Sequence, residues 1–165
     1  MKFSDIIGQE SAKKRLKAMI DNGRLPHALV IEGPEGTGKF ALARAAVQYL
    51  HCQNRGNGEP CGVCPSCVQH QTFNHIDTIY SFPVLKSAGG AVSDDFSSLW
   101  HDFLQKSMYM NYELWQSLLG NPNGQPVIYV DESQEIIRKL TFTSHGATDK
   151  VVLMWSVSYT HIRAH

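Results

Sequence analysis

The spacing of apolar and polar residues along the chain predicts an alternation of helices and short strands. The first segment, residues 9–22, places Leu16, Met19 and Ile20 on one face, which is typical of an amphipathic helix. The predicted helices cover residues 9–22, 39–51 and 133–140, with two shorter ones, broken near Met110-Asn111, within 96–119. The predicted strands cover residues 25–32, 75–82 and 151–155. We therefore expect an α/β fold.

A glycine-rich turn, GPEGTGKF, joins the first predicted strand to the helix at 39–51. Gly33, Gly36 and Gly38 permit backbone angles that turn successive N–H groups inward, and Lys39 adds a mobile cation at the start of a helix. This order of strand, loop and helix predicts a site for nucleotide phosphate. The alternative is a turn that binds nothing. Phe40 stands where magnesium-binding loops carry Ser or Thr, so we expect binding without hydrolysis.

The run VIYVDE, residues 127–132, admits two interpretations. Four apolar residues followed by Asp131 and Glu132 are typical of the strand that carries a magnesium-binding aspartate and a water-positioning glutamate in ATPases. Alternatively, Asp131 or Ser133 starts the next helix, where a negative charge favours the N-terminal dipole. The apolar run at 151–155 is the better candidate for a buried central strand, and no carboxylate follows it.

All the cysteines of the chain lie in one segment with the spacing C-x8-C-x2-C-x2-C; they are Cys52, Cys61, Cys64 and Cys67. Two overlapping short spacings allow thiolates to converge on one ion, and four sulfur ligands leave no open position, so the pattern predicts a structural zinc. A disulfide pair and an iron–sulfur cluster are the alternatives. His51 and His70 flank the segment and could replace a cysteine, but with four thiols present we expect them to be bystanders.

Composition adds few constraints. Lys and Arg together number 15, as do Asp and Glu, so net charge gives no argument for binding nucleic acid or a membrane surface. No signal peptide opens the chain and no apolar run approaches the roughly 18 residues of a membrane span. We expect one soluble, cytoplasmic domain.

Several stretches taken together resemble a known family. They are FSDIIGQE, RLPHALVIEGPEGTGK, the cysteine spacing, and EIIRKL ahead of DKVVLMW. In this order they are similar to the N-terminal AAA+ domain of bacterial clamp-loader subunits of DNA polymerase III, and to the delta-prime branch more than to gamma/tau. The resemblance runs from about Phe3 to Trp155 and is weakest at about 88–126, which looks like a helical insertion.

The resemblance implies a P-loop AAA+ three-layer domain with a parallel sheet, truncated, and with a four-cysteine zinc knuckle inserted at 52–67. It places Gly33, Gly36, Thr37, Gly38 and Lys39 on phosphate, and Ile7 and Gly8 near the adenine. It also maps the second magnesium-binding strand onto 151–155, so that Trp155 stands at the position of its first acid. Both magnesium-ligand positions, Phe40 and Trp155, then lack an oxygen.

The function implied by the resemblance is that of a non-motor subunit, not an enzyme on its own, which assists ATP-dependent loading of the sliding clamp in DNA replication. It would carry structural zinc and bind ATP or ADP without hydrolysis. Its partners would be gamma/tau and delta in a hetero-pentamer and, through that complex, the sliding clamp and primed DNA. The alternatives are an ATP-hydrolysing gamma/tau-type motor that uses Lys39, Asp131 and Glu132, and a zinc-dependent module that binds nucleic acid.

The resemblance stops at Trp155. Residues 156–165, SVSYTHIRAH, are similar to translated sequencing-adapter sequence, so we expect a non-native tail; an ordinary polar terminus is the alternative. In the family, the neighbours of the P-loop strand follow Trp155. We therefore expect an N-terminal fragment in which the strand at 25–32 lacks neighbours or pairs directly with 151–154.

Overall fold

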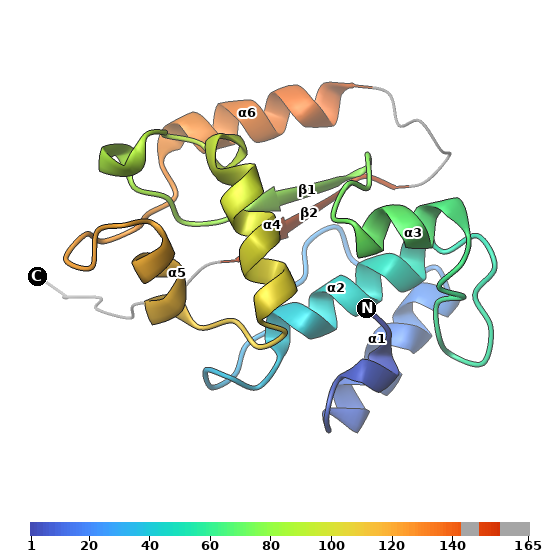
Figure 1. Ribbon diagram of the computed structural model, residues 1–165. Coiled ribbons are helices and arrows are strands. Elements are labelled where there is room, and N and C mark those ends of the chain that lie inside the picture. Colours follow the sequence, from blue (N-terminus) through green and yellow to red (C-terminus); the bar gives the residue numbers. More distant parts are fainter. Residues whose placement is uncertain (143–148, 156–165) are drawn as a thin grey trace, which may run out of the picture.

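The computed structural model describes residues 1–142 and 149–155, and the tail at 156–165 lies outside them (Figure 1). The α-helices are α1 (Glu10–Asp21), α2 (Lys39–His51), α3 (Pro65–Gln71), α4 (Ser97–Lys106), α5 (Tyr112–Leu118) and α6 (Val130–Thr141). Short 3-10 turns occur at Phe3–Asp5, Lys86–Ala88 and Ser93–Phe96, and the strands are β1 (Thr78–Ser81) and β2 (Val151–Met154). None of the helices described is long and apolar enough to cross a membrane.

The two strands form a small parallel sheet. Thr78 pairs with Val151 and Ser81 with Met154, so the ladder runs without a slip. Helix α6 contacts β1 and α2 contacts β2, and Figure 1 shows the strands between these two helices. The structure thus confirms an α/β arrangement with a parallel sheet and the strands predicted within 75–82 and 151–155.

The predicted strand at residues 25–32 is wrong. The structure has no strand there, and the side chains of Leu29 and Val30 are 46% and 77% exposed. Direct pairing of 29–31 with 151–154 is not formed either, since the sheet contains only β1 and β2 among the described residues. A strand needs a neighbour to satisfy its backbone groups, and in the described part of the chain this apolar run has none.

The helical predictions are confirmed. Helices α1 and α2 fall within 9–22 and 39–51, and α2 is rich in alanine, the strongest helix former. The aromatic segment 96–119 contains two helices, α4 and α5, separated by residues 107–111. The break is fixed by Asn111, whose side-chain oxygen accepts a hydrogen bond of 3.0 Å from the Leu114 N–H and so caps α5.

The run at 127–132 begins a helix. Val127 makes a short antiparallel bridge with Val84, and α6 starts at Val130. Asp131 and Glu132 therefore lie in the first helical turn, where the helix dipole favours negative charge. The helix-start interpretation of these carboxylates is confirmed.

Two hydrophobic clusters pack against α2 from different directions. One contains Phe3 and Ile6 together with apolar residues of α1, and the other contains Trp100, Phe103 and Trp115 of α4 and α5. Helix α2 contributes Phe40 to the second cluster, at the first turn after the glycine-rich loop. The loop is therefore mounted on a helix that is held on both sides.

Candidate nucleotide and metal sites

The glycine-rich loop turns into the N-terminus of α2. Gly36 and Gly38 have φ values of +76° and +80°, the left-handed conformation that favours glycine. Lys39 opens the helix, and its ammonium group donates hydrogen bonds to the carbonyl oxygens of Gly33 (2.8 Å) and Pro34 (2.5 Å). The lysine thus folds back over the loop, at the place where a phosphate would compete with these carbonyls for it.

A cavity of about 440 Å³ lies in front of the loop. Gly33, Gly36, Gly38 and Lys39 line its polar side, while Thr37 does not reach it and instead donates a hydrogen bond of 2.8 Å to the Pro34 carbonyl. The structure therefore brings together four of the five residues predicted to contact phosphate. Leu29, Ile31 and residues 152–154 of β2 also line the cavity.

The two positions predicted to lack a magnesium-binding oxygen lie on this cavity. Phe40 and Trp155 both line it, and both pack against Trp100 with ring centroids 5.7 Å away. Phe40 is only 7% exposed. Each side chain is part of the aromatic cluster, so the wall facing Lys39 at these two positions is apolar.

Ile7 and Gly8, predicted near the adenine, do not line the cavity. The Ile7 side chain is 84% exposed, and its backbone N–H donates a hydrogen bond of 3.3 Å to the hydroxyl of Tyr109. The Tyr109 ring also lies 3.0 Å from the position that a Cβ atom would take at Gly38. Tyr109 thus connects the segment around Ile7 with the glycine-rich loop at Gly38. Sequence reasoning missed it, because a tyrosine between two helices carries no recognisable signal.

Asp131 and Glu132 are held away from the loop. Asp131 forms an exposed ion pair of 3.3 Å with Lys86. Glu132 is buried, and its carboxylate accepts a hydrogen bond of 2.8 Å from the Ser93 backbone N–H. Neither residue lines the cavity in front of Lys39.

The four cysteines converge at the end of α2. All four Sγ atoms lie within 4.8 Å of one another; the residues are Cys52, Cys61, Cys64 and Cys67. The Sγ atoms of Cys61 and Cys67 are 3.9 Å apart, close to the separation of about 3.8 Å that follows from Zn–S bonds of about 2.3 Å at a tetrahedral ion. The Cys67 backbone N–H donates to the Cys64 sulfur at 3.4 Å. This donor set fits a closed four-sulfur metal site.

The thiols differ in acidity without a metal. Backbone N–H groups of Val63 and Cys64 lower the pKa of Cys61 to about 6, whereas burial raises the pKa of Cys67 to about 12. A coordinated cation deprotonates a thiol outright. Metal binding at this cluster would therefore release the proton of the Cys67 thiol.

Three histidines form a separate buried cluster beside the thiols. His51 Nδ1 and His70 Nε2 share a hydrogen bond of 3.0 Å, and the ring of His75 stacks on both at 4.4 and 4.1 Å. Because the stacked rings are nearly parallel, their in-plane lone pairs do not point at one common ion. Burial lowers the pKa of His70 to about 2 and of His75 to about 4, so both are neutral at pH 7. His75 was not predicted.

These features define an α/β protein with a phosphate-loop-like turn on one helix end and a cluster of four thiols at the other. Residues 8–165 match the model of the family described as DNA polymerase III, delta subunit, and the chain belongs to that family.

Curated relatives are similar to this chain over part of its length. The gamma/tau subunit of Mycobacterium tuberculosis (strain ATCC 25618 / H37Rv) is 41% identical over 66 residues, which are 40% of this chain and 11% of that protein. The tau subunit of Escherichia coli (strain K12) is 34% identical over 77 residues, which are 47% of this chain and 12% of that protein. The gamma/tau subunit of Mycoplasma pneumoniae is 32% identical over 93 residues, which are 56% of this chain and 13% of that protein. The matched regions thus span only about an eighth of these relatives.

Proposed function

We propose that this chain is a non-motor, delta-prime-like subunit of the DNA polymerase III clamp loader, assisting ATP-dependent loading of the sliding clamp in DNA replication. Membership of the DNA polymerase III family and similarity to gamma/tau subunits support the assignment to the clamp loader. The finer assignment, to a subunit that does not hydrolyse ATP, rests on the residues around the cavity in front of Lys39.

The observation that carries this assignment is the pair of aromatic side chains on that cavity. Phosphoryl transfer depends on magnesium held between the β- and γ-phosphates by oxygen ligands. Phe40 occupies the loop position of one such ligand, and Trp155 follows the strand that would present the other. Neither side chain carries an oxygen, and both pack against the ring of Trp100 in the aromatic cluster.

Lys39 and the loop amides retain what binding of ATP or ADP requires, namely a cation and inward N–H groups at a helix N-terminus. We infer that nucleotide is bound through Gly33, Gly36, Gly38 and Lys39, the predicted residues that line the cavity. Thr37, Ile7 and Gly8, which do not line it, would contact the nucleotide only after the loop and the segment around Ile7 move. When a nucleotide binds, its phosphate would replace the Gly33 and Pro34 carbonyl oxygens as the partner of the Lys39 ammonium group.

We further infer one structural zinc on the four cysteines. A closed four-sulfur site has no position for a substrate, so the role of the metal is to fix residues 52–67 against the end of α2. The partners proposed for the subunit are gamma/tau and delta in a hetero-pentamer, and the sliding clamp and primed DNA through that complex.

The experiment that tests the proposal compares nucleotide hydrolysis with assembly. We expect the purified chain to show no magnesium-dependent ATP turnover above that of a Lys39→Ala variant, and to co-elute with the gamma/tau and delta subunits of the same genome in gel filtration. Turnover that is lost in both Lys39→Ala and Asp131→Asn would instead establish a motor subunit. Absence of any complex with those subunits would refute the clamp-loader role itself.

A further inference from the structure

Within residues 1–142 and 149–155, the outer edge of β1 carries backbone groups without a strand partner. Hydrogen bonds from Val151 N to Asp77 O (2.9 Å) and from Trp155 N to Ser81 O (2.8 Å) show that the odd-numbered residues of this stretch face β2. In a parallel ladder the even-numbered residues then direct their N–H and C=O groups the other way. Tyr80 is the central residue of that outward-facing set.

One end of this edge is already closed by a side chain. Ser93 Oγ accepts a hydrogen bond from the Phe82 backbone N–H (3.0 Å) and donates one to the Phe82 carbonyl (3.2 Å). These are the two bonds that a neighbouring strand would make. At Tyr80, the preceding outward-facing residue, no equivalent pair of bonds is formed within residues 1–142 and 149–155.

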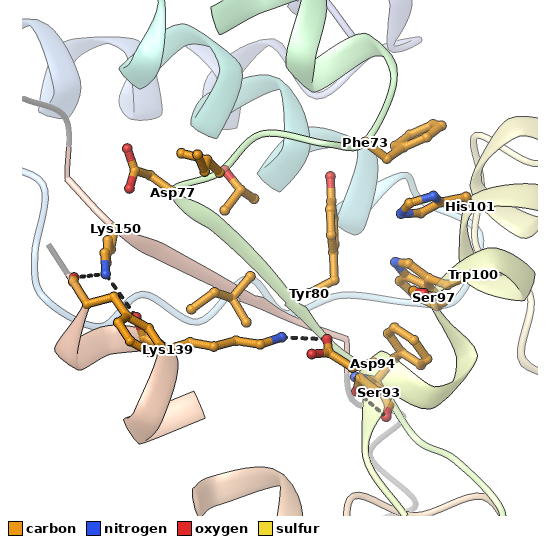
Figure 2. A pocket seen from close by; sticks show the side chains of 15 residues that line it. Phe73, Asp77, Tyr80, Ser93, Asp94, Ser97, Trp100, His101, Lys139 and Lys150 are labelled. Carbon is orange, nitrogen blue, oxygen red and sulfur yellow. Dashed lines mark hydrogen bonds and ion pairs between the residues drawn. The ribbon is translucent and has the colours of Figure 1, made fainter. Parts of the chain in front are cut away.

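A cavity of about 390 Å³ runs along this open part of the edge (Figure 2). Its walls come from the strand, from α4 and from α6, so it is a groove beside a strand with a helix on each flank. We call it the edge groove, defined by Ile79, Tyr80, Trp100, His101 and Lys139. Figure 2 shows Tyr80, Trp100 and His101 turned toward the same space.

The indole N–H of Trp100 is an unsatisfied donor in the wall of the edge groove. The residue is 1% exposed, and its Nε1 atom has no hydrogen-bond partner among the described residues. Figure 2 shows this nitrogen on the side of the ring that faces Tyr80. The neighbouring Trp115 is satisfied, since its Nε1 donates to the Pro83 carbonyl at 2.8 Å. A buried donor left unbonded costs free energy. Because Nε1 has almost no accessible surface, an acceptor in the groove would recover this free energy only after the surrounding side chains shift.

We propose that the edge groove binds an extended peptide segment of a partner protein, added beside β1 as a further strand. A peptide backbone offers alternating acceptors and donors, which is the complement of the open N–H and C=O of Tyr80, and its carbonyls are acceptors for Trp100 Nε1. Side chains of the added strand would alternate between the α4 flank and the α6 flank. Neither nucleotide nor metal binding is needed for this interaction.

Amide exchange tests whether the edge is open in the full chain. Because Ile79 and Ser81 direct their N–H groups to β2 and Tyr80 does not, we expect the Tyr80 amide to exchange at least tenfold faster than those two. Equal protection of all three amides would mean that the edge is already paired, and would overturn the proposal.

Binding is tested with a probe from a phage-displayed library of random twelve-residue peptides. We expect enriched peptides to slow amide exchange at Tyr80. Their affinity for the Trp100→Phe variant should be at least tenfold weaker than for the wild-type protein. The Trp115→Phe variant, which removes an indole outside the groove, should bind them with wild-type affinity. N-methylation of the peptide backbone should weaken binding similarly, which keeps the test decisive if a tryptophan variant fails to fold. A library that yields no binder, or binders that leave Tyr80 exchange unchanged and do not distinguish Trp100→Phe from Trp115→Phe, would refute the proposal.

Discussion

Replacing Phe40 by serine tests whether this position belongs to chemistry or to packing. The substitution would install the hydroxyl that magnesium-binding loops carry after the lysine. The structure instead places Phe40 in the hydrophobic core, 7% exposed and with its ring 5.7 Å from Trp100 and 6.3 Å from Tyr80. We therefore expect Phe40→Ser to unfold the protein more readily, and not to create an active site.

The expected loss follows from what is removed and what is buried. Truncating a buried Phe to Ala costs about 3–5 kcal/mol, and a buried hydroxyl without a partner adds about 1–3 kcal/mol. Domains of this kind are stable by only about 5–15 kcal/mol in total. Since each kcal/mol lowers the melting temperature by about 2–4 °C in chains of about this length, the transition should fall by on the order of 10 °C or more.

The assay is urea or thermal unfolding followed by circular dichroism, with Phe40→Leu as the matched control. Leucine keeps most of the apolar volume, so its loss should be clearly smaller than that of serine. If Phe40→Ser unfolds within about 1 kcal/mol of wild type, Phe40 does not contribute to the core as described. In that case, magnesium-dependent ATP turnover by the same variant would further show that the position is a vacated ligand site.

Four other substitutions test separate parts of the structure. Gly36→Ala should lower the free energy of urea unfolding by about 1 kcal/mol, because the φ of Gly36 is +76°. Gly38→Ala should lower it more, because its Cβ would also meet the Tyr109 ring at 3.0 Å. Equal losses in the two variants would contradict that contact. Metal analysis should find one zinc per chain in the wild-type protein and none in Cys64→Ser. Chelation should unfold at least residues 52–67, since structural zinc contributes about 10–16 kcal/mol in small peptides. Finding iron, or no metal, in the wild-type protein would refute the site. Burial lowers the pKa of His75 from 6.5 to about 4, so the stability that neutral His75 contributes should be fully present above pH 6.5 and decline toward pH 4. His75→Gln should flatten this decline in the unfolding free energy. A pH profile of stability that is unchanged in His75→Gln would contradict the prediction.

Local periodicity predicted the helices well because a helix satisfies its own backbone. Helices α1 and α2 carry their apolar faces and end signals within one segment, and the break between α4 and α5 was visible as polar residues around Asn111. The run at 25–32 has an equally apolar sequence, yet it forms no strand. Whether such a run becomes a strand depends on an adjacent edge, which no feature of the run itself encodes.

The candidate sites divide in the same way. The cysteine cluster and the residues around Lys39 were found because their spacing along the chain reports on their geometry directly. Tyr109, His75 and Trp100 matter through contacts with residues distant in sequence, and nothing around them marks those contacts. They could be identified only once the helices had been placed.

Helix α2 begins at Lys39 and ends at His51, so the glycine-rich loop and the thiol cluster lie at opposite ends of one element. A rigid helix could transmit disorder from one end to the other. The contacts oppose this, because Phe40 is held by Trp100 and Tyr80 near the loop, far along the helix from the histidines that pack beside the thiols. Each end has its own packing, so disorder at the thiol cluster should leave the glycine-rich loop in place, and disorder of that loop should leave the thiol cluster intact.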